Sequence, residues 1–227
     1  MIICQVENKS AFSRIGLGSK YDNLQPSARS HSLALLSGQR VIIASHNPGK
    51  VREMRAILAP FKLNLVAAAE MQLEEPTEDG DTFAANAEIK ATSASRSTGL
   101  TAIADDSGLV VPALNGSPGI YSARWAGPEK NYAKAINLIK ARLGNLSKNA
   151  HFTCALTVAP PSGICHTFIG HIFGQLTFPA RGAKGFGYDS IFIPDGYSKT
   201  FGEMDQNTKH AISHRSQAFK QLREELL

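Results

Sequence analysis

The sequence predicts an α/β protein built on a mixed β-sheet with helices on its faces. Short runs of β-branched and small apolar residues at 41–45 and 101–104 have the length and composition of buried strands. They alternate with segments such as 82–97, in which apolar residues recur at helical spacing. This alternation is typical of sheets with parallel strands, whereas 152–178 predicts neighbouring strands joined by a hairpin turn. A sheet with both parallel and antiparallel pairs accounts for the two patterns together.

The first half of the domain is predicted to contain a strand, a loop, a helix and a second helix. The strand at 41–45 leads through a loop into a helix over 50–58. The second helix is expected over 82–97, with Asp81 as its N-cap and Gly99 ending it.

The second half continues with a buried strand at 101–104 and a third helix over 133–143. The strands within 152–178 are expected to turn at 160–163, where two prolines, a serine and a glycine follow one another. The chain closes with a helix within 209–227, whose regular part begins near Ser213.

The chain of 227 residues is long enough for one domain with a substantial core. Residues 1–39 are serine-rich and show no sustained apolar period, so we expect a disordered extension there. Residues 40–227 contain no internal repeat and no convincing linker, and they are predicted to form one domain.

Composition argues against several classes of function. The net charge is +5, of which residues 1–40 carry +3, so the body is nearly neutral and no general nucleic-acid surface is expected. No apolar run approaches the length of a membrane span. The three cysteines are odd in number and show no C-x-x-C spacing, which fits a reducing, cytoplasmic environment without a disulfide framework.

The first candidate site is the loop between the first strand and the first helix. It reads Ser45, His46, Asn47, Pro48, Gly49, Lys50. Free backbone N–H groups at a helix start favour a phosphate, and the lysine adds a full positive charge. The loop does not match a Walker A motif, and an ordinary turn between strand and helix is the alternative.

The second candidate is the acid pair Asp105-Asp106, with Ser107 and Gly108 after it, at the expected end of a buried strand. Two adjacent carboxylates suit a divalent metal or the activation of water, and a simple turn is the alternative. On the preceding helix, Asn86 and Lys90 lie four residues apart and therefore share one face.

Two further stretches carry candidate residues. In 182–189, glycines flank aromatic residues and would let a planar ligand approach the backbone, although a plain glycine-rich loop is the alternative. In 209–215, basic groups gather at the expected start of the last helix, where they oppose its dipole unless an anion lies nearby. A surface helix start is the alternative there.

The four candidate sites follow one another along the chain in an order and at a spacing that can be compared with known families. The matching stretches are SHNPGK, TFAANAEIKA, IADDSGLVVPALNGSPGIYSARWAG, KGFGYDSIF and KHAISHR. Through them the chain resembles the inosine triphosphate pyrophosphatase family over about residues 40–225, and the joint occurrence is more specific than any single motif. Ser190 departs from the family's usual proline after FGYD, next to the expected base site.

The resemblance implies an elongated mixed sheet with flanking helices, two lobes around a central cleft, and a homodimer that requires Mg²⁺. It implies hydrolysis of non-standard purine nucleoside triphosphates (ITP, dITP, XTP) to the monophosphate and pyrophosphate. Asp106 would be the catalytic proton acceptor, and Asp106 with Glu78 would hold the metal. The implied substrate-binding residues are Ser45, His46, Asn47, Pro48, Gly49, Lys50, Lys90, Ser107, Phe186, Gly187, Tyr188, Asp189, Lys209, His214 and Arg215.

Within that set, Phe186 would stack on the purine and Arg215 would donate to a 6-oxo group, which adenine lacks. Three other classes of function are alternatives to this one: a pyrophosphatase for other modified nucleotides, a non-catalytic nucleotide-binding module, and a Ser-His-Asp hydrolase. The last would combine Ser107, His214 and Asp189, but the chain contains no G-x-S-x-G elbow.

Overall fold

The computed structural model describes residues 35–161 and 163–226. Most of the predicted extension at 1–39 therefore lies outside the described residues. Its last part, 35–39, contacts the body: the Leu35 side chain is buried in the core, and Gln39 Nε2 donates to Thr101 Oγ1 at 3.2 Å.

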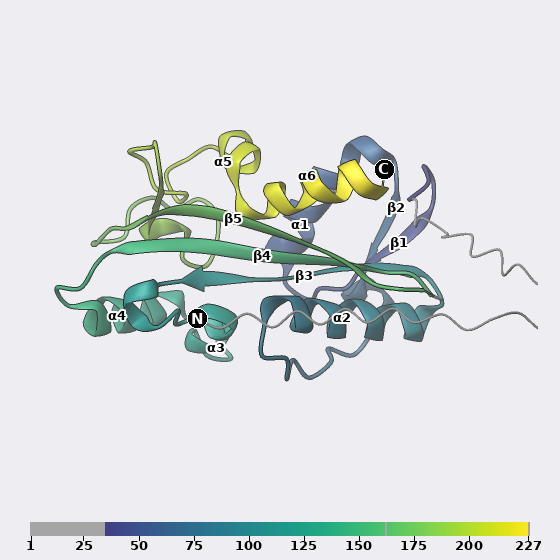
Figure 1. Cartoon of the computed structure of the whole chain (residues 1–227), viewed down its shortest axis with the longest axis horizontal. Coiled ribbons are helices and arrows are strands. Elements are labelled where there is room, and N and C mark those ends of the chain that lie inside the picture. Colours follow the sequence, from purple (N-terminus) through teal and green to yellow (C-terminus); the bar gives the residue numbers. More distant parts are fainter. Residues whose placement is uncertain (1–34, 162, 227) are drawn as a thin grey trace, which may run out of the picture. The chain divides into compact units, whose positions relative to one another are not determined.

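The fold is of the predicted class, a mixed six-stranded sheet with flanking helices (Figure 1). The strands are β1 (Arg40–Ile43), β2 (Asn64–Ala67), β3 (Thr101–Val110), β4 (Asn149–Ala159), β5 (His166–Leu176) and β6 (Phe192–Pro194). They lie in the order β2-β1-β3-β4-β5-β6. The β1 strand pairs in parallel with β2 and β3, and the remaining pairs are antiparallel.

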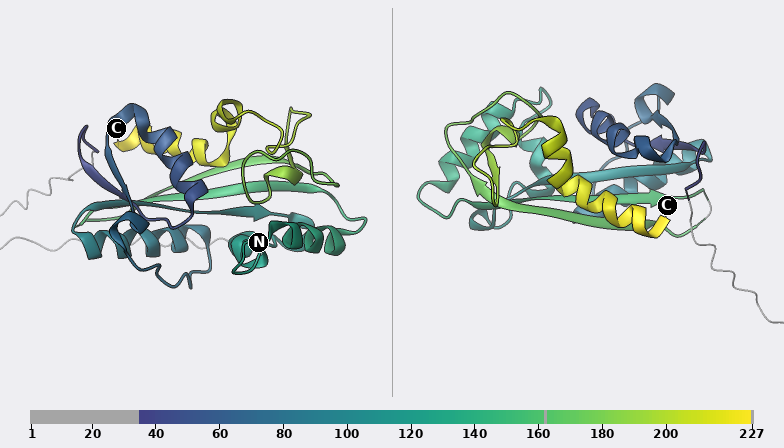
Figure 2. Two further views of the ribbon diagram at one scale, coloured as in Figure 1. Left: turned by 180° about the vertical axis from the view of Figure 1, so that it is seen from behind. Right: turned by 90° about the horizontal axis from the view of Figure 1, so that it is seen from above.

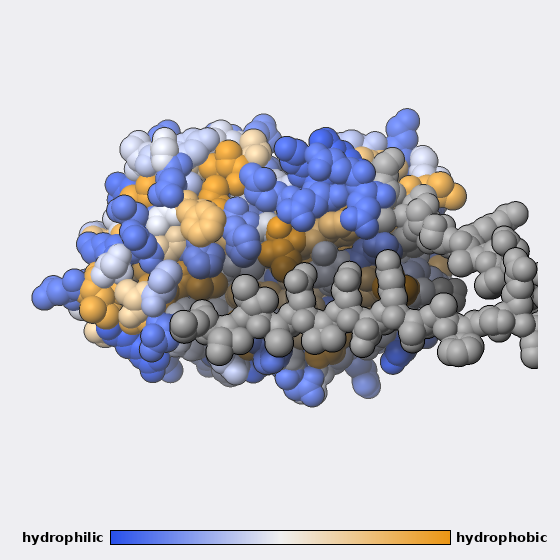
Figure 3. Space-filling model, in the orientation of Figure 1, coloured by the Kyte–Doolittle hydropathy of each residue, from blue (hydrophilic) through white to orange (hydrophobic). Residues whose placement is uncertain are grey.

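Helices cover both faces of this sheet. They are α1 (Pro48–Leu58), α2 (Phe83–Thr98), α3 (Ser122–Trp125), α4 (Tyr132–Leu143), α5 (Gln206–Ile212) and α6 (His214–Leu226). In Figures 1 and 2, α2, α3 and α4 lie on one face, and α1, α5 and α6 lie on the other. The outward face of α6 is hydrophilic (Figure 3), while Ala218, Phe219 and Leu222 on its inward face are buried. None of the helices in the described part of the chain is long and apolar enough to cross a membrane.

Small side chains allow α2 to lie close to the sheet. Ala87 and Ala91 are fully buried and Ala94 nearly so, and this alanine face packs against β3 and β4 as its helical spacing predicts. The N-cap of α2 is Thr82, whose Oγ1 accepts from Ala85 N at 3.1 Å, so the prediction of Asp81 is wrong by one residue. A hydroxyl makes the same cap as a carboxylate, and sequence alone does not choose between neighbours.

The largest difference from the sequence prediction is the length of β3. The strand does not end at residue 104 but runs through the acid pair to Val110, paired with β4 along this length. Side chains alternate in a strand, so Asp105 and Asp106 point to opposite faces of the sheet. Each carboxylate finds cations on its own face, which removes the repulsion that had indicated a turn.

The last helical segment is divided into α5 and α6. Ser213 between them has extended backbone angles (φ −63°, ψ 156°) and caps α6 through its Oγ, which accepts from Ser216 N at 3.2 Å. The predicted start near Ser213 is thus confirmed for α6, and the break turns His214 and Arg215 inward at the first residues of that helix.

The helix α6 crosses β5 at Gly170. A Cβ atom placed there would collide with the carbonyl oxygen of His214 and the backbone nitrogen of Ala218. Only glycine permits this crossing, which sets the distance between α6 and the sheet.

We therefore expect Gly170→Ala to lower the free energy of unfolding by about 1–3 kcal/mol or more, because the helix must move outward. Urea denaturation should show a lower midpoint. Gln175→Ala, at an exposed position of the same strand, is the matched control and should change the midpoint little. Equal midpoints for the two variants would contradict this account of the crossing.

Candidate active site

The site is a cleft at the edge of β3, beyond the point where β1 ends. The β1 strand pairs with β3 only over Thr101–Ile103, and among the described residues no strand pairs with that edge over the acid pair. Side chains from both faces of β3 therefore reach the same cleft. Its lining includes Lys90 and Asp106 from the α2 face and Arg215 from the α6 face.

The loop before α1 lines the cleft and is internally braced. Asn47 Oδ1 accepts from Gly49 N at 2.9 Å and Lys50 N at 3.4 Å, and Ser45 Oγ accepts from Asn47 N at 3.2 Å. The expected free N–H groups of this helix start are thus partly taken by the Asn47 cap. Lys50 Nζ lies 3.4 Å from Asp105 Oδ2, so its ammonium group is the main positive charge that the loop brings to the cleft.

On the α2 face, one lysine joins the two predicted metal ligands. Lys90 Nζ lies 2.7 Å from Glu78 Oε1 and 3.4 Å from Asp106 Oδ1. Burial raises the pKa of Asp106, and Lys90 and Lys50 only partly oppose this. Burial alone would lower the Lys90 pKa, but the Asp106 and Glu78 carboxylates raise it, so the ammonium stays charged. The result is a buried carboxylate of raised basicity beside a fixed cation.

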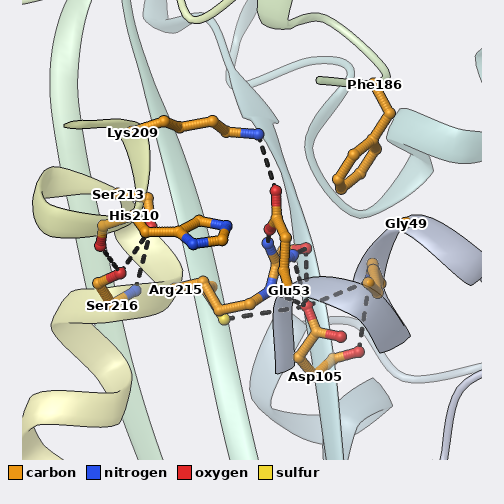
Figure 4. Close-up of polar contacts among 12 residues, drawn as sticks. Gly49, Glu53, Asp105, Phe186, Lys209, His210, Ser213, Arg215 and Ser216 are labelled. Atoms are coloured by element: carbon orange, nitrogen blue, oxygen red, sulfur yellow. Dashed lines mark hydrogen bonds and ion pairs between the residues drawn. The ribbon is translucent and has the colours of Figure 1, made fainter. Parts of the chain in front are cut away.

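On the α6 face lies a network of buried charges (Figure 4). Arg215 is 1% exposed and donates through Nη2 to Asp105 Oδ2 at 2.9 Å and to Ser107 Oγ at 3.0 Å. Its Nε also donates to Asp105, and Nη1 donates to Glu53. Four of the five guanidinium donors are thereby occupied.

Lys209 extends this network toward the glycine-rich loop. Its Nζ lies 2.8 Å from Glu53 Oε1 and 2.7 Å from Asp189 Oδ2. The Arg215 and Lys209 cations outweigh burial and hold the pKa of Glu53 below its usual value. At Asp189 burial dominates and raises the pKa despite Lys209.

Aromatic rings line the same end of the cleft. Phe186 lies over Gly49, where a Cβ would be 3.0 Å from its ring, and Lys209 Nζ is 5.0 Å from the ring centroid. His214 stacks on Phe152 with centroids 4.9 Å apart. Burial, together with the Arg215 and Lys209 charges, lowers the His214 pKa well below its usual value, so the imidazole is neutral. The cleft therefore has one end at Lys90 and its two carboxylates, and an aromatic end at Phe186, where the rings lie beside the buried ion network.

The structure brings together every predicted site residue except Pro48 and Gly49, which do not line the cleft. Tyr188 is held by its hydroxyl, which donates to the Ser122 carbonyl at 2.8 Å. Sequence reasoning did not single out Glu53. It also missed Tyr132, which lines the cleft and packs edge-on against Tyr188 with ring centroids 5.3 Å apart. Glu53 carried one signal, since it lies one turn after Lys50 on the first helix; Tyr132 carried none.

The chain belongs to the Ham1 family, which matches residues 41–225. It is 52% identical over 187 residues to a dITP/XTP pyrophosphatase of Zymomonas mobilis, covering 81% of this chain and 90% of that protein. It is 50% identical to a dITP/XTP pyrophosphatase of Rhodospirillum centenum, covering 82% and 94%. Its fold matches the structure of the Staphylococcus aureus Ham1 protein with a TM-score of 0.74 and 35% identity, covering 82% of this chain and 97% of that one.

Removing one charge from the buried network should cost stability. We expect Glu53→Gln to lower the free energy of unfolding by about 3–5 kcal/mol, because Arg215 and Lys209 would lose a shared buried carboxylate. The control is Arg55→Ala on the same helix, which breaks an exposed 2.6 Å pair with Glu70 and should leave the melting temperature nearly unchanged. If thermal denaturation gives equal losses for both variants, the network does not stabilise the fold in this way.

Proposed function

We propose that this enzyme, a nucleoside triphosphate pyrophosphatase, hydrolyses non-standard purine nucleoside triphosphates of the dITP, XTP and ITP type to the monophosphate and pyrophosphate. Membership of the Ham1 family and the names of its relatives support the reaction class. The observation that carries the residue roles is the two-ended cleft. Lys90, Glu78 and Asp106 suit a charged phosphate chain, and Phe186 with Arg215 suits a 6-oxopurine.

In this proposal Asp106 takes the proton from the attacking water. A general base must be ionised and yet basic enough to accept a proton, and burial raises the Asp106 pKa in that direction. Lys90 stays protonated and offsets negative charge as the pyrophosphate leaves. Lys50, with 14% of its side chain exposed, offers a second positive charge from the opposite side of the strand.

The donor set fits Mg²⁺. Glu78 and Asp106 share contact with one cationic group, Lys90, so their oxygens surround a common position for positive charge. Among the described residues no group of three or more metal-ligating side chains converges, and Mg²⁺ typically needs only one or two carboxylates beside phosphates and water. When bound, the metal ion would polarise the phosphate and stabilise its charge.

Base selection belongs to the aromatic end. The stacked His214 is neutral, and Arg215 keeps one N–H that is not already used by Asp105, Ser107 or Glu53. That donor would pair with a 6-oxo group and would face an unsuitable amino group in adenine. The ion network holds the guanidinium in a fixed orientation, which sharpens the discrimination.

The homodimeric assembly and cytoplasmic location expected from the sequence remain parts of this proposal. The homodimer rests on the family resemblance, and the cytoplasmic location rests on cysteine usage. The two described cysteines, Cys154 and Cys165, are free thiols, which agrees with a reducing compartment.

Replacing the proposed base should separate chemistry from folding. We expect Asp106→Asn to lose nearly all pyrophosphate release from dITP and XTP at saturating Mg²⁺, because an amide cannot accept the proton. Its melting temperature should be retained, since an uncharged group costs less to bury at this position. Asp79→Asn, an exposed acid next to Glu78, is the control and should keep full turnover. Substantial turnover by the Asp106 variant would remove Asp106 from the role of base.

A further inference from the structure

Asn86 is a fully buried polar residue of α2 that the proposed chemistry does not use. Its side chain is 0% exposed, and it lies one turn before Lys90 on the face that meets the cleft. A buried amide must find partners for its donor and acceptor. Those partners show what Asn86 holds together.

Each end of this amide has one partner. Asn86 Oδ1 accepts from Gly80 N at 2.9 Å, and Nδ2 donates to Asp106 Oδ2 at 3.4 Å. Because a backbone N–H can only donate and a carboxylate only accepts, the orientation of the amide is fixed by chemistry. One end therefore touches the segment that carries Glu78, and the other touches the proposed base.

The fit at Gly80 is close. A Cβ there would lie 2.7 Å from Asn86 Oδ1 and 2.8 Å from Ala85 Cβ, so only glycine lets the backbone reach the amide. The same segment is held at a second point, where Arg124 of α3 donates to the Glu78 carbonyl oxygen. The segment thus has two side-chain anchors, one at Glu78 and one at Gly80.

We infer that Asn86 is a positioning residue that couples the Glu78 segment, residues 74–81, to Asp106 and so sets the spacing of the two carboxylates. This rests on the roles proposed above for Glu78 and Asp106. Lys90 also contacts both carboxylates, but an incoming phosphate competes for its charge. The Asn86 contacts are made by a neutral amide to a backbone group and a carboxylate, so they persist while the charges in the cleft rearrange.

Three variants test this coupling from different sides. Asn86→Ala removes both contacts, Gly80→Ala breaks only the loop contact, and Asn86→Asp keeps the acceptor for Gly80 while replacing the donor to Asp106 with an acid. Thr82→Ala is the control, because it removes the α2 N-cap and weakens the same helix start without touching Asp106. The readouts are NMR hydrogen exchange of the backbone amide at position 80 in the nucleotide-free protein, and kcat and KM with dITP.

We expect Asn86→Ala and Gly80→Ala to speed hydrogen exchange of the amide at position 80 by about tenfold or more and to lower kcat by about 10–100-fold, with a smaller change in KM. Asn86→Asp should keep the Gly80 protection and still lose turnover. An ionised aspartate cannot donate to the Asp106 carboxylate and places a like charge beside it. Thr82→Ala should leave kcat unchanged.

Wild-type kcat and wild-type Gly80 exchange in Asn86→Ala would overturn the inference. An equal loss of kcat in all four variants would also overturn the inference, because it would show that weakening the start of α2 is enough to lower turnover. Failure of the proposed function would be distinct: the wild type would release no pyrophosphate from any tested triphosphate, while the exchange measurements would still report the coupling of Asn86 to the segment.

Discussion

The arrangement of this site depends on β3 extending beyond β1. The parallel pairing with β1 stops at Ile103, and β3 continues to Val110. Over the acid pair, β4 is its one partner strand among the residues that the structure describes. In a strand covered on both edges, alternate side chains would be separated by the sheet. At this edge Asp106 and Ser107, on opposite faces of β3, both line one cleft. Asp105 does not line it but binds Arg215, which does, so the two adjacent acids have different roles.

Asp105 serves the buried ion network. Its carboxylate contacts Arg215 and Lys50, and burial alone would raise its pKa, but these cations hold the pKa well below the usual value. The network of Glu53, Asp105 and Asp189 is charge-balanced only when Lys50 is counted with Lys209 and Arg215. Burying charges costs several kcal/mol per ion, which close pairing must offset. The paired charges hold the Arg215 guanidinium, and with it the N–H donors at the aromatic end of the cleft, in a fixed orientation.

Asp106 lies in a different environment. Its neighbours Lys90 and Asn86 both come from α2, which can approach β3 because of its alanine face. The small residues of α2 allow the helix to pack close to β3. Because the two elements are close, the polar residues of α2 can contact Asp106 on the strand. Larger residues at the alanine positions would move Lys90 and Asn86 away from the carboxylate.

Much of the fold and the site could be predicted from the sequence because helical periods and short apolar strands carry local signals. The end of β3 was misplaced because Asp105 and Asp106 resemble a turn unless their distant cations are known. Of the cations at Asp105, Arg215 lies 110 residues further along the chain, and Lys50 lies 55 residues before it. Glu53 was missed for the same reason, since a glutamate on a helix is ordinarily solvated and only tertiary contacts bury it.

The central claim is that one substrate spans the edge of β3, with its base on the Asp105 face and its phosphates on the Asp106 face. A crystal structure of the full chain with α,β-imido-ITP, a triphosphate that resists cleavage at the reacting bond, and Mg²⁺ tests it most directly. The account predicts the purine against Phe186 and His214, and the phosphate chain beside Lys90 and Asp106. A nucleotide bound wholly on one face of β3, with Asp106 remote from the α-phosphate, would contradict it.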